Sequence, residues 1–153
     1  MHVCNTVWKM RDTDILCSFP VDKSPSVTVA FEDYKTLENE IYINDVIVDF
    51  YLSYLHEKML NKKEASKIHI FPSMFYKRLL QKRFSDDTTT LNAAQTRHQQ
   101  VKKWTKKVDL FSKKMIVIPI CEKKHWYAIV VVKPDQADRF FVVLDRFAIP
   151  SKK

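Results

Sequence analysis

CEKKHWYAIVVV, residues 121–132, is the stretch that decides the fold of this chain. Its second part is an apolar run rich in β-branched residues, with the length of one strand, and a histidine and a tryptophan begin it. FFVVLD follows at 140–145 after a short polar connection. Because short connections join antiparallel neighbours, we expect 125–132 and 140–145 to form a hairpin.

A third apolar run, MIVIPI at 115–120, precedes the short connection CEKK, so we expect three antiparallel strands in succession. The strands 125–132 and 140–145 are apolar on both faces, which predicts a sheet covered on both sides. Helical patterns lie before these strands. The fold class is therefore α+β, with a mainly antiparallel central sheet flanked by helices.

The clearest helical pattern begins near residue 44. Asn44 is a suitable N-cap, and Asp45 places a carboxylate in the first turn, where the helix dipole favours it. His56 falls outside the apolar face and is predicted to be a surface residue. That face, which we expect to be buried along one stripe, comprises Ile47, Phe50, Tyr51, Tyr54 and Leu55.

The remaining elements are short. Ser73 can cap the second clear helix, over 74–83, because it follows Pro72, which ends a strand at 68–71. The other predicted elements are strands at 6–10, 15–19 and 26–29, a short helix around 31–37, a polar loop over 84–100 and a short amphipathic helix over 101–109.

Composition limits the class of protein. The 153 residues are 46% hydrophobic, enough for a core, and the apolar runs are far shorter than the ~18 residues of a membrane span. The start of the chain lacks the pattern of a secretory signal, and three scattered cysteines do not suggest disulfides. The absence of glycine excludes a P-loop and a dinucleotide fingerprint.

The net charge of +8 leaves two interpretations open, a nucleic-acid partner or a solvated lysine surface. The lysines occur in pairs scattered over expected helices and turns. They are not interleaved with aromatic residues as in RNA-recognition modules. The pattern favours the solvated surface and disfavours nucleic acid.

His125 and Asp145 are the candidate chemical pair. If Val132 pairs with Phe140, Tyr127 faces Asp145, and His125 lies on the same face two residues away. Such diagonal neighbours are about 7–8 Å apart at the backbone. A carboxylate can fix the tautomer of a histidine that deprotonates a nucleophile. The alternatives are a buried ion pair or two unrelated residues at strand ends.

Cys121 is not expected to be that nucleophile. Four extended residues span about 13 Å, and no helix N-terminus lies beneath the thiol to lower its pKa. We interpret it as a structural thiol, and Cys4 and Cys17 lie in the weakly patterned start of the chain. Cys121 and His125 could form half of a zinc site, but no second Cys or His pair lies nearby, so no metal is expected.

Four blocks in order carry a resemblance to a known family. The blocks are SVTVAFEDYKTLENEIYINDVIVDFYLSYL, IHIFPSMFYKRLL, RHQQVKKWTKKVDLFSKKMIVIPICEKKHWYAIVVV and FFVVLD. Together they resemble the SUMO-specific cysteine proteases, the Ulp/SENP family, over 26–145, and most resemble the branch that trims poly-SUMO chains. The resemblance implies a papain-like fold of the Ulp type over 26–153, after a poorly patterned segment at 1–25.

The resemblance also implies roles. His125 and Asp145 match the histidine and aspartate of a Cys-His-Asp triad that cuts after the Gly-Gly end of SUMO. Trp126 and Tyr42 match the aromatic walls of a narrow tunnel for that tail. Asn44 and Asp45 match a substrate-binding motif, in which the acidic residue meets a basic patch on SUMO. No cofactor is implied.

In the family, the nucleophile follows the aspartate by several tens of residues, at the start of a helix. This chain ends soon after Asp145, so we expect the N-terminal two-thirds of a catalytic domain, inactive by itself, with apolar sheet surface left uncovered. The alternatives are a catalytically inactive SUMO-binding module and a basic nucleic-acid-binding protein. The expected partners are SUMO or SUMO-conjugated proteins, and a monomer is expected, with no membrane attachment. The resemblance implies a nuclear location, or otherwise a cytoplasmic one, without secretion.

Overall fold

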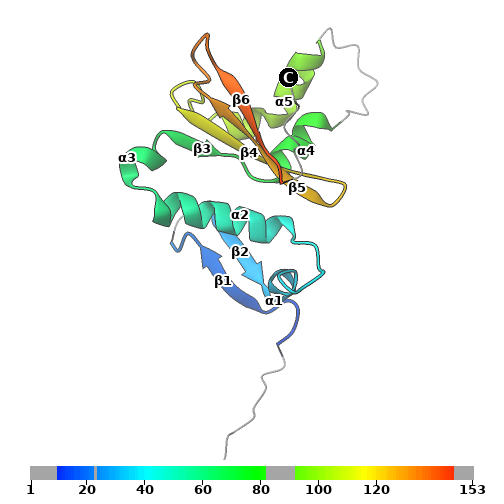
Figure 1. The fold of residues 1–153 in the computed structure, drawn as a ribbon. Coiled ribbons are helices and arrows are strands. Elements are labelled where there is room, and N and C mark those ends of the chain that lie inside the picture. Colours follow the sequence, from blue (N-terminus) through cyan, green and yellow to red (C-terminus); the bar gives the residue numbers. More distant parts are fainter. Residues whose placement is uncertain (1–9, 23, 82–91, 147–153) are drawn as a thin grey trace, which may run out of the picture. The chain divides into compact units, whose positions relative to one another are not determined.

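The computed structural model describes residues 10–22, 24–81 and 92–146, and the chain divides into two compact units, Met1–Leu55 and His56–Lys153. Each unit is described by itself (Figure 1). No helix of the described residues is both long and apolar enough to cross a membrane.

The first unit is built on a two-stranded antiparallel sheet. Strands β1 (Ile15–Phe19) and β2 (Val27–Ala30) form it, and helix α1 (Phe31–Lys35) follows β2 directly. Helix α2 (Asp45–Tyr54) packs on this sheet, as seen in Figure 1, through ring contacts of Phe19. These elements confirm the strands expected at 15–19 and 26–29. They also confirm the short helix expected around 31–37 and the helix expected to begin near residue 44.

The start of α2 is fixed as predicted. The Asn44 side chain accepts a hydrogen bond from the Ile47 N–H at 3.0 Å, and its amide donates to the Asp33 carboxylate at 2.7 Å. Ile47 is buried, but the expectation of a fully buried stripe is wrong for Tyr51 and Tyr54, which are 57% and 40% exposed. Tyrosine is often only partly buried, and here the apolar face of α2 is covered at Ile47 but not fully at Tyr51 and Tyr54.

The second unit begins at His56, within the turn that follows α2. Its elements are the π-helical turn η1 (Leu55–Met59), α3 (Lys62–Ala65), β3 (Ile68–Ile70), α4 (Met74–Leu80), α5 (Ala93–Thr105), β4 (Met115–Glu122), β5 (His125–Val132) and β6 (Phe140–Leu144).

One four-stranded sheet organises this unit, in the order β3-β4-β5-β6. β3 runs parallel to β4, whereas the β4–β5 and β5–β6 pairs are antiparallel. The register pairs Val132 with Phe140 and Ala128 with Leu144. The expected mainly antiparallel sheet and the expected hairpin register are therefore confirmed.

The core of the second unit lies between the sheet and the helices α4 and α5, which lie together beside it in Figure 1. Phe71, Phe75, Val101 and Ile116 form this buried cluster, and the rings of Phe71 and Phe75 stack at 3.6 Å. Ile120 of β4 is the one fully buried large side chain among the described residues. The aromatic pair therefore ties β3 to α4.

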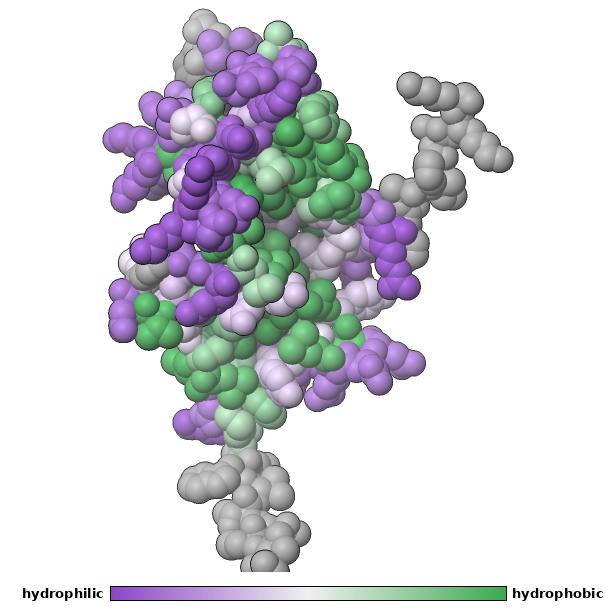
Figure 2. Space-filling model, turned by 60° about the vertical axis from the view of Figure 1, so that its left-hand side comes forward, coloured by the Kyte–Doolittle hydropathy of each residue, from purple (hydrophilic) through white to green (hydrophobic). Residues whose placement is uncertain are grey.

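The outer strand β6 remains largely uncovered. Its exposed side chains are Phe140, Phe141, Val143 and Leu144. Figure 2 shows hydrophobic surface, in green, open to solvent beside hydrophilic areas. The prediction of a sheet covered on both sides is therefore wrong at β6, whereas the prediction of uncovered apolar sheet surface is confirmed.

The sequence predictions for the starts of α5 and α4 are wrong. Residues 93–100 are helical rather than loop, because Asn92 and Gln95 form a reciprocal capping box that starts α5, and α5 ends at Thr105. Ser73 makes no capping hydrogen bond to α4, since its own backbone is helical. The strand expected at 6–10 and the loop at 84–91 fall outside the described residues, apart from Met10.

Candidate active site

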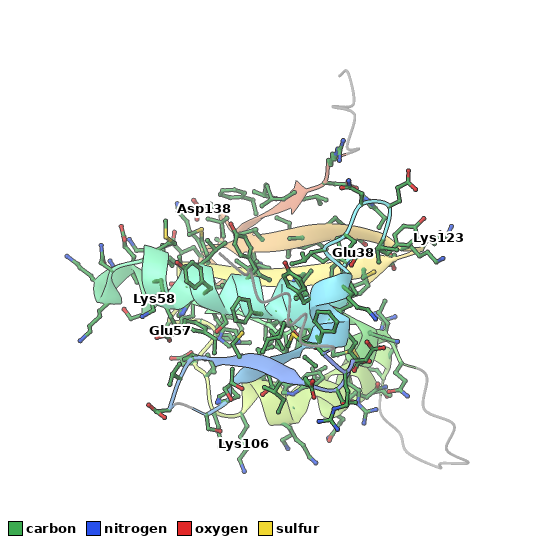
Figure 3. All side chains as sticks on the ribbon, turned by 90° about the horizontal axis from the view of Figure 1, so that it is seen from below. Glu38, Glu57, Lys58, Lys106, Lys123 and Asp138 are labelled. Atoms are coloured by element: carbon green, nitrogen blue, oxygen red, sulfur yellow. The ribbon has the colours of Figure 1, made fainter. Side chains whose placement is uncertain are left out.

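The candidate site lies at the turn between β4 and β5. Lys123 and Lys124 form this two-residue turn with φ of 50° and 63°, which pairs Glu122 with His125. Positive φ at both positions matches the twist of a tight hairpin, and it usually requires glycine or asparagine. Figure 3 shows Lys123 at this end of the sheet and Asp138 at the other end. The turn therefore sets where His125 begins its strand.

His125 and Asp145 contact each other directly. The distance from His125 Nε2 to Asp145 Oδ1 is 2.7 Å, and the two side chains are 32% and 23% exposed. His125 begins β5 and Asp145 follows the end of β6, so the antiparallel register brings them together at one end of the sheet. The sequence-based expectation that they converge is confirmed.

This contact assigns different functions to the two ring nitrogens. An ionised carboxylate only accepts hydrogen bonds, so Nε2 is the donor toward Asp145. Nδ1 then carries the lone pair of the neutral ring and can take a proton from a thiol. The carboxylate also stabilises the charged imidazolium that results.

Cys121 lies on the other side of the sheet from His125. In the register, Cys121 pairs with Trp126, whereas His125 pairs with the neighbouring Glu122, and successive residues of a strand face opposite sides. Cys121 is exposed and forms no disulfide. The side chains of Cys121 and His125 therefore point to opposite faces of the sheet, which favours the interpretation of Cys121 as a structural thiol.

The other residues named by the resemblance are placed in both units. Trp126 is half-buried at the second position of β5. Tyr42 is 62% exposed, Asp45 is an exposed first residue of α2, and Asn44 caps that helix. These three belong to Met1–Leu55 and are described within that unit. Their roles toward a substrate remain predictions.

Tyr127 and Glu122 flank His125, although sequence reasoning gave neither a role. The Tyr127 hydroxyl donates to Glu122 Oε2 at 2.7 Å, and this bond raises the pKa of Tyr127 to about 12. The rings of Tyr127 and His125 stack with centroids 6.1 Å apart and planes at 20°. These three residues and Lys123 line an open cavity of about 520 Å³. The sequence signal for Tyr127 was its position two residues after His125, which places both side chains on the same face of the strand.

Two further histidines lie away from this site. The prediction that His56 is a surface residue is wrong, because it is half-buried and its Nε2 donates to the carbonyls of Ala65 and Ile68 at 3.1 and 3.3 Å. His69 Nε2 is buried without a hydrogen-bond partner among the described residues. Burial lowers the pKa of His69, and the charges of Lys113 and His56 lower it further.

Comparison with known proteins agrees with this geometry. Residues 42–150, which include both His125 and Asp145, match the sequence model of the Ulp1 protease family, C-terminal catalytic domain. The chain belongs to the Ulp1 protease family. Membership in this family confirms the resemblance described above and makes the chain part of a group of cysteine proteases.

Similar proteins come from animals and fungi. Sentrin-specific protease 6 of Mus musculus is 45% identical over 116 residues, which are 75% of this chain and 10% of that protein. Ubiquitin-like-specific protease 2 of Schizosaccharomyces pombe is 39% identical over 120 residues, which are 77% of this chain and 18% of that protein. The chain therefore spans less than a fifth of either relative.

Solved structures of the family share the fold. A de-sumoylating protease crystal structure is 29% identical, with a TM-score of 0.56, over 75% of this chain and 41% of that one. The C-terminal Ulp1 protease domain in complex with Smt3, the yeast ortholog of SUMO, is 19% identical, with a TM-score of 0.59, over 87% of this chain and 50% of that one. The α+β fold is therefore of the Ulp type.

Proposed function

We propose that this chain supplies the histidine and the aspartate of a cysteine peptidase that cuts after the Gly-Gly end of SUMO. The observation that supports this function is the 2.7 Å contact between His125 Nε2 and Asp145 Oδ1 in a chain of the Ulp1 protease family. The pair has the arrangement of a base held by a carboxylate, the same use as in other catalytic triads.

In this proposal the reaction has two halves. His125 Nδ1 takes the proton of a cysteine thiol, and the thiolate attacks the carbonyl carbon of the last glycine of SUMO. The bond from that carbon to the lysine or peptide nitrogen breaks, and the imidazolium returns the proton to the leaving amine. Water then hydrolyses the thioester with the same histidine as base.

The substrate tail is proposed to bind against an aromatic side chain of the second unit. Trp126 would cover the Gly-Gly tail, because only a residue without a side chain fits beneath such a ring. Asp45 would meet a basic patch on the body of SUMO, and its exposed position at the start of α2 leaves its carboxylate open to such a partner. Asn44 holds the start of that helix in place.

The nucleophile is proposed to come from sequence outside these 153 residues. Cys121 faces the side of the sheet opposite His125, and the family places its cysteine after the aspartate. The chain by itself is therefore expected to bind SUMO without hydrolysing it.

Two measurements test this proposal. Binding of SUMO to this chain is measured by calorimetry, and Trp126→Ala and Asp45→Lys are expected to weaken it at least tenfold, whereas Glu38→Lys is the matched surface control. A longer chain that contains a family cysteine is treated with SUMO carrying an electrophile at its C-terminus. Labelling at that cysteine, lost in His125→Ala but not in His98→Ala, supports the triad.

A SUMO-binding module without activity is the second candidate, favoured by the placement of Cys121. It shares the binding result with the protease but differs in the labelling experiment. A longer chain that binds SUMO normally and shows no His125-dependent labelling is a module rather than an enzyme. The nuclear location and monomeric state expected for the chain belong to the same proposal, and imaging and light scattering test them.

A further inference from the structure

We propose that β6 pairs edge to edge with β6 of a second copy of this chain, in an antiparallel register centred on Val142. The pairing goes beyond the proposed function and does not depend on it, because it uses only the outer edge of the sheet. In the part of the chain that the structure describes, β6 is the last strand of the sheet and pairs with β5 on one side only (Figure 1).

The edge of β6 has no feature that blocks pairing. An open edge presents backbone N–H and C=O groups to another strand, and natural proteins often protect it with a lysine, a proline or a bulge. The strand Phe140–Leu144 is entirely apolar, and no bulge interrupts its register with β5. Phe140 and Leu144 on one face, and Phe141 and Val143 on the other, are 49–65% exposed. Both faces of the strand are therefore open to a partner.

The sequence around β6 is complementary to itself in the antiparallel direction. The segment from Asp138 to Arg146 reads DRFFVVLDR. When Val142 lies opposite Val142 of the second copy, Arg139 lies opposite Asp145. The same register places Asp138 opposite Arg146. Opposite charges across a strand pair stabilise it, so both ends of the paired strands favour this register.

The same charges disfavour the neighbouring registers. A shift by one residue in one direction places Asp138 opposite Asp145, and a shift in the other direction places Arg139 opposite Arg146. Like charges directly opposite each other destabilise a strand pair. Asp145 keeps its contact with His125 in the centred register, because a carboxylate accepts more than one hydrogen bond.

The pairing closes on two copies. A two-fold axis through Val142 uses the same strand in both copies, so the interface leaves no β6 edge free for a third copy. A strand of five residues in each copy makes a small interface, of the size that is typical of transient complexes. The dilute chain is therefore the monomer proposed above, and pairs form as its concentration rises.

Analytical ultracentrifugation of this chain over a range of concentrations tests the association. We expect the mass to rise from one copy toward two copies and no further. Arg139→Glu, which places a like charge opposite Asp145, is expected to weaken the association at least tenfold. Arg97→Glu, at an exposed position on α5, is the matched charge reversal and should leave it unchanged.

Three results of this experiment would overturn the inference. A mass of one copy at every concentration would leave the β6 edge to an extended segment of another protein. Growth beyond two copies would show open-ended aggregation. An association that Arg139→Glu does not weaken would show that a different surface forms the contact.

Disulfide formation tests the register, in a chain whose three cysteines are replaced by serine. Residues directly opposite each other have Cα atoms about 4.5–5.5 Å apart, within disulfide reach, so Val142→Cys is expected to form a linked dimer under mild oxidation. Phe140→Cys is expected not to link to itself, since its two copies lie four residues apart along the paired strands, about 13 Å. Mixed with Leu144→Cys, which lies opposite, it is expected to link.

Linkage of Phe140→Cys to itself as readily as Val142→Cys would show parallel or random pairing and overturn the register. If Val142→Cys fails to fold, the mixture of the two exposed positions gives the same answer, and no linkage in that mixture overturns the register equally. Neither experiment uses SUMO or a nucleophile. A failure of the proposed function therefore leaves both results unchanged.

Discussion

His125 and Asp145 are 20 residues apart in sequence, yet their side chains meet at 2.7 Å because the hairpin of β5 and β6 closes between them. The contact is partly shielded from water, with side-chain exposures of 32% and 23%. A second ion pair, between Lys133 and Asp138 at 2.9 Å, lies at the opposite end of the sheet and is far more exposed.

These two pairs form a matched comparison. We expect Asp145→Asn to lower the unfolding free energy by about 0.5–1.5 kcal/mol, because it removes a charge-assisted hydrogen bond from a half-buried partner. Asp138→Asn is expected to change it far less, as is usual for exposed pairs. Urea denaturation measures both, and equal effects of the two substitutions would contradict the special position of Asp145.

The β4–β5 turn gives a stabilising prediction. Lys124 has φ of 63°, which costs energy for a residue with a Cβ, so Lys124→Gly is expected to raise the unfolding free energy by about 0.5–1 kcal/mol. Lys106 at the end of α5 has φ of −58°, and Lys106→Gly is expected to lower it. Thermal unfolding followed by circular dichroism separates the two. Destabilisation by Lys124→Gly would show that its backbone is not held in the left-handed region.

His69 predicts a dependence of stability on pH. Its folded pKa lies below the ordinary value of 6.5, so the unfolded state binds more protons between the two values. The stability contribution of His69 is therefore complete above pH 6.5 and is lost as the pH falls toward the folded pKa. His69→Leu should make the unfolding free energy less dependent on pH in this window, since it removes the titrating imidazole.

The control for this prediction is His98→Leu, at an exposed position on α5. The unfolding free energy, measured by urea denaturation from pH 8 to pH 5, should depend on pH in this variant as it does in the wild type. A wild-type dependence on pH in His69→Leu would contradict the assignment of this dependence to His69.

A central strand and an edge strand of the sheet predict different costs for truncation to alanine. Ile120 is 0% exposed, so Ile120→Ala should cost about 2–5 kcal/mol through lost burial and a cavity. Phe141 is 65% exposed on β6, and Phe141→Ala should cost less than about 1 kcal/mol. Chemical denaturation tests both. A large decrease in unfolding free energy for Phe141→Ala would mean that another surface covers β6 in solution.

The sequence predicted the sheet and the His125–Asp145 pair well, because each depends on local pattern. Alternating and apolar runs fix the strands, and a short connection between them fixes the register that brings the pair together. The N-cap at Asn44 was equally readable, since a side-chain acceptor before an apolar face is a local signal.

The errors arise where tertiary contacts decide. His56 is half-buried because its ring forms hydrogen bonds to the carbonyls of Ala65 and Ile68, which lie outside its own helical turn. The sequence pattern around His56 does not predict these bonds. The early start of α5 was missed because residues 93–100 contain no large apolar side chain, although the pair Asn92 and Gln95 signalled it. The link from Tyr127 to Glu122 depends on a turn in which two lysines take an unusual backbone conformation.

The parallel pairing of β3 with β4 has a consequence for the order of folding. Strands β4, β5 and β6 are joined by short connections and close at low entropic cost, whereas β3 meets β4 only after the long segment with α4 and α5 has been spanned. Non-local parallel pairing of this kind is slow to nucleate. The hairpins that carry His125 and Asp145 can therefore assemble before the strand that completes the sheet joins them.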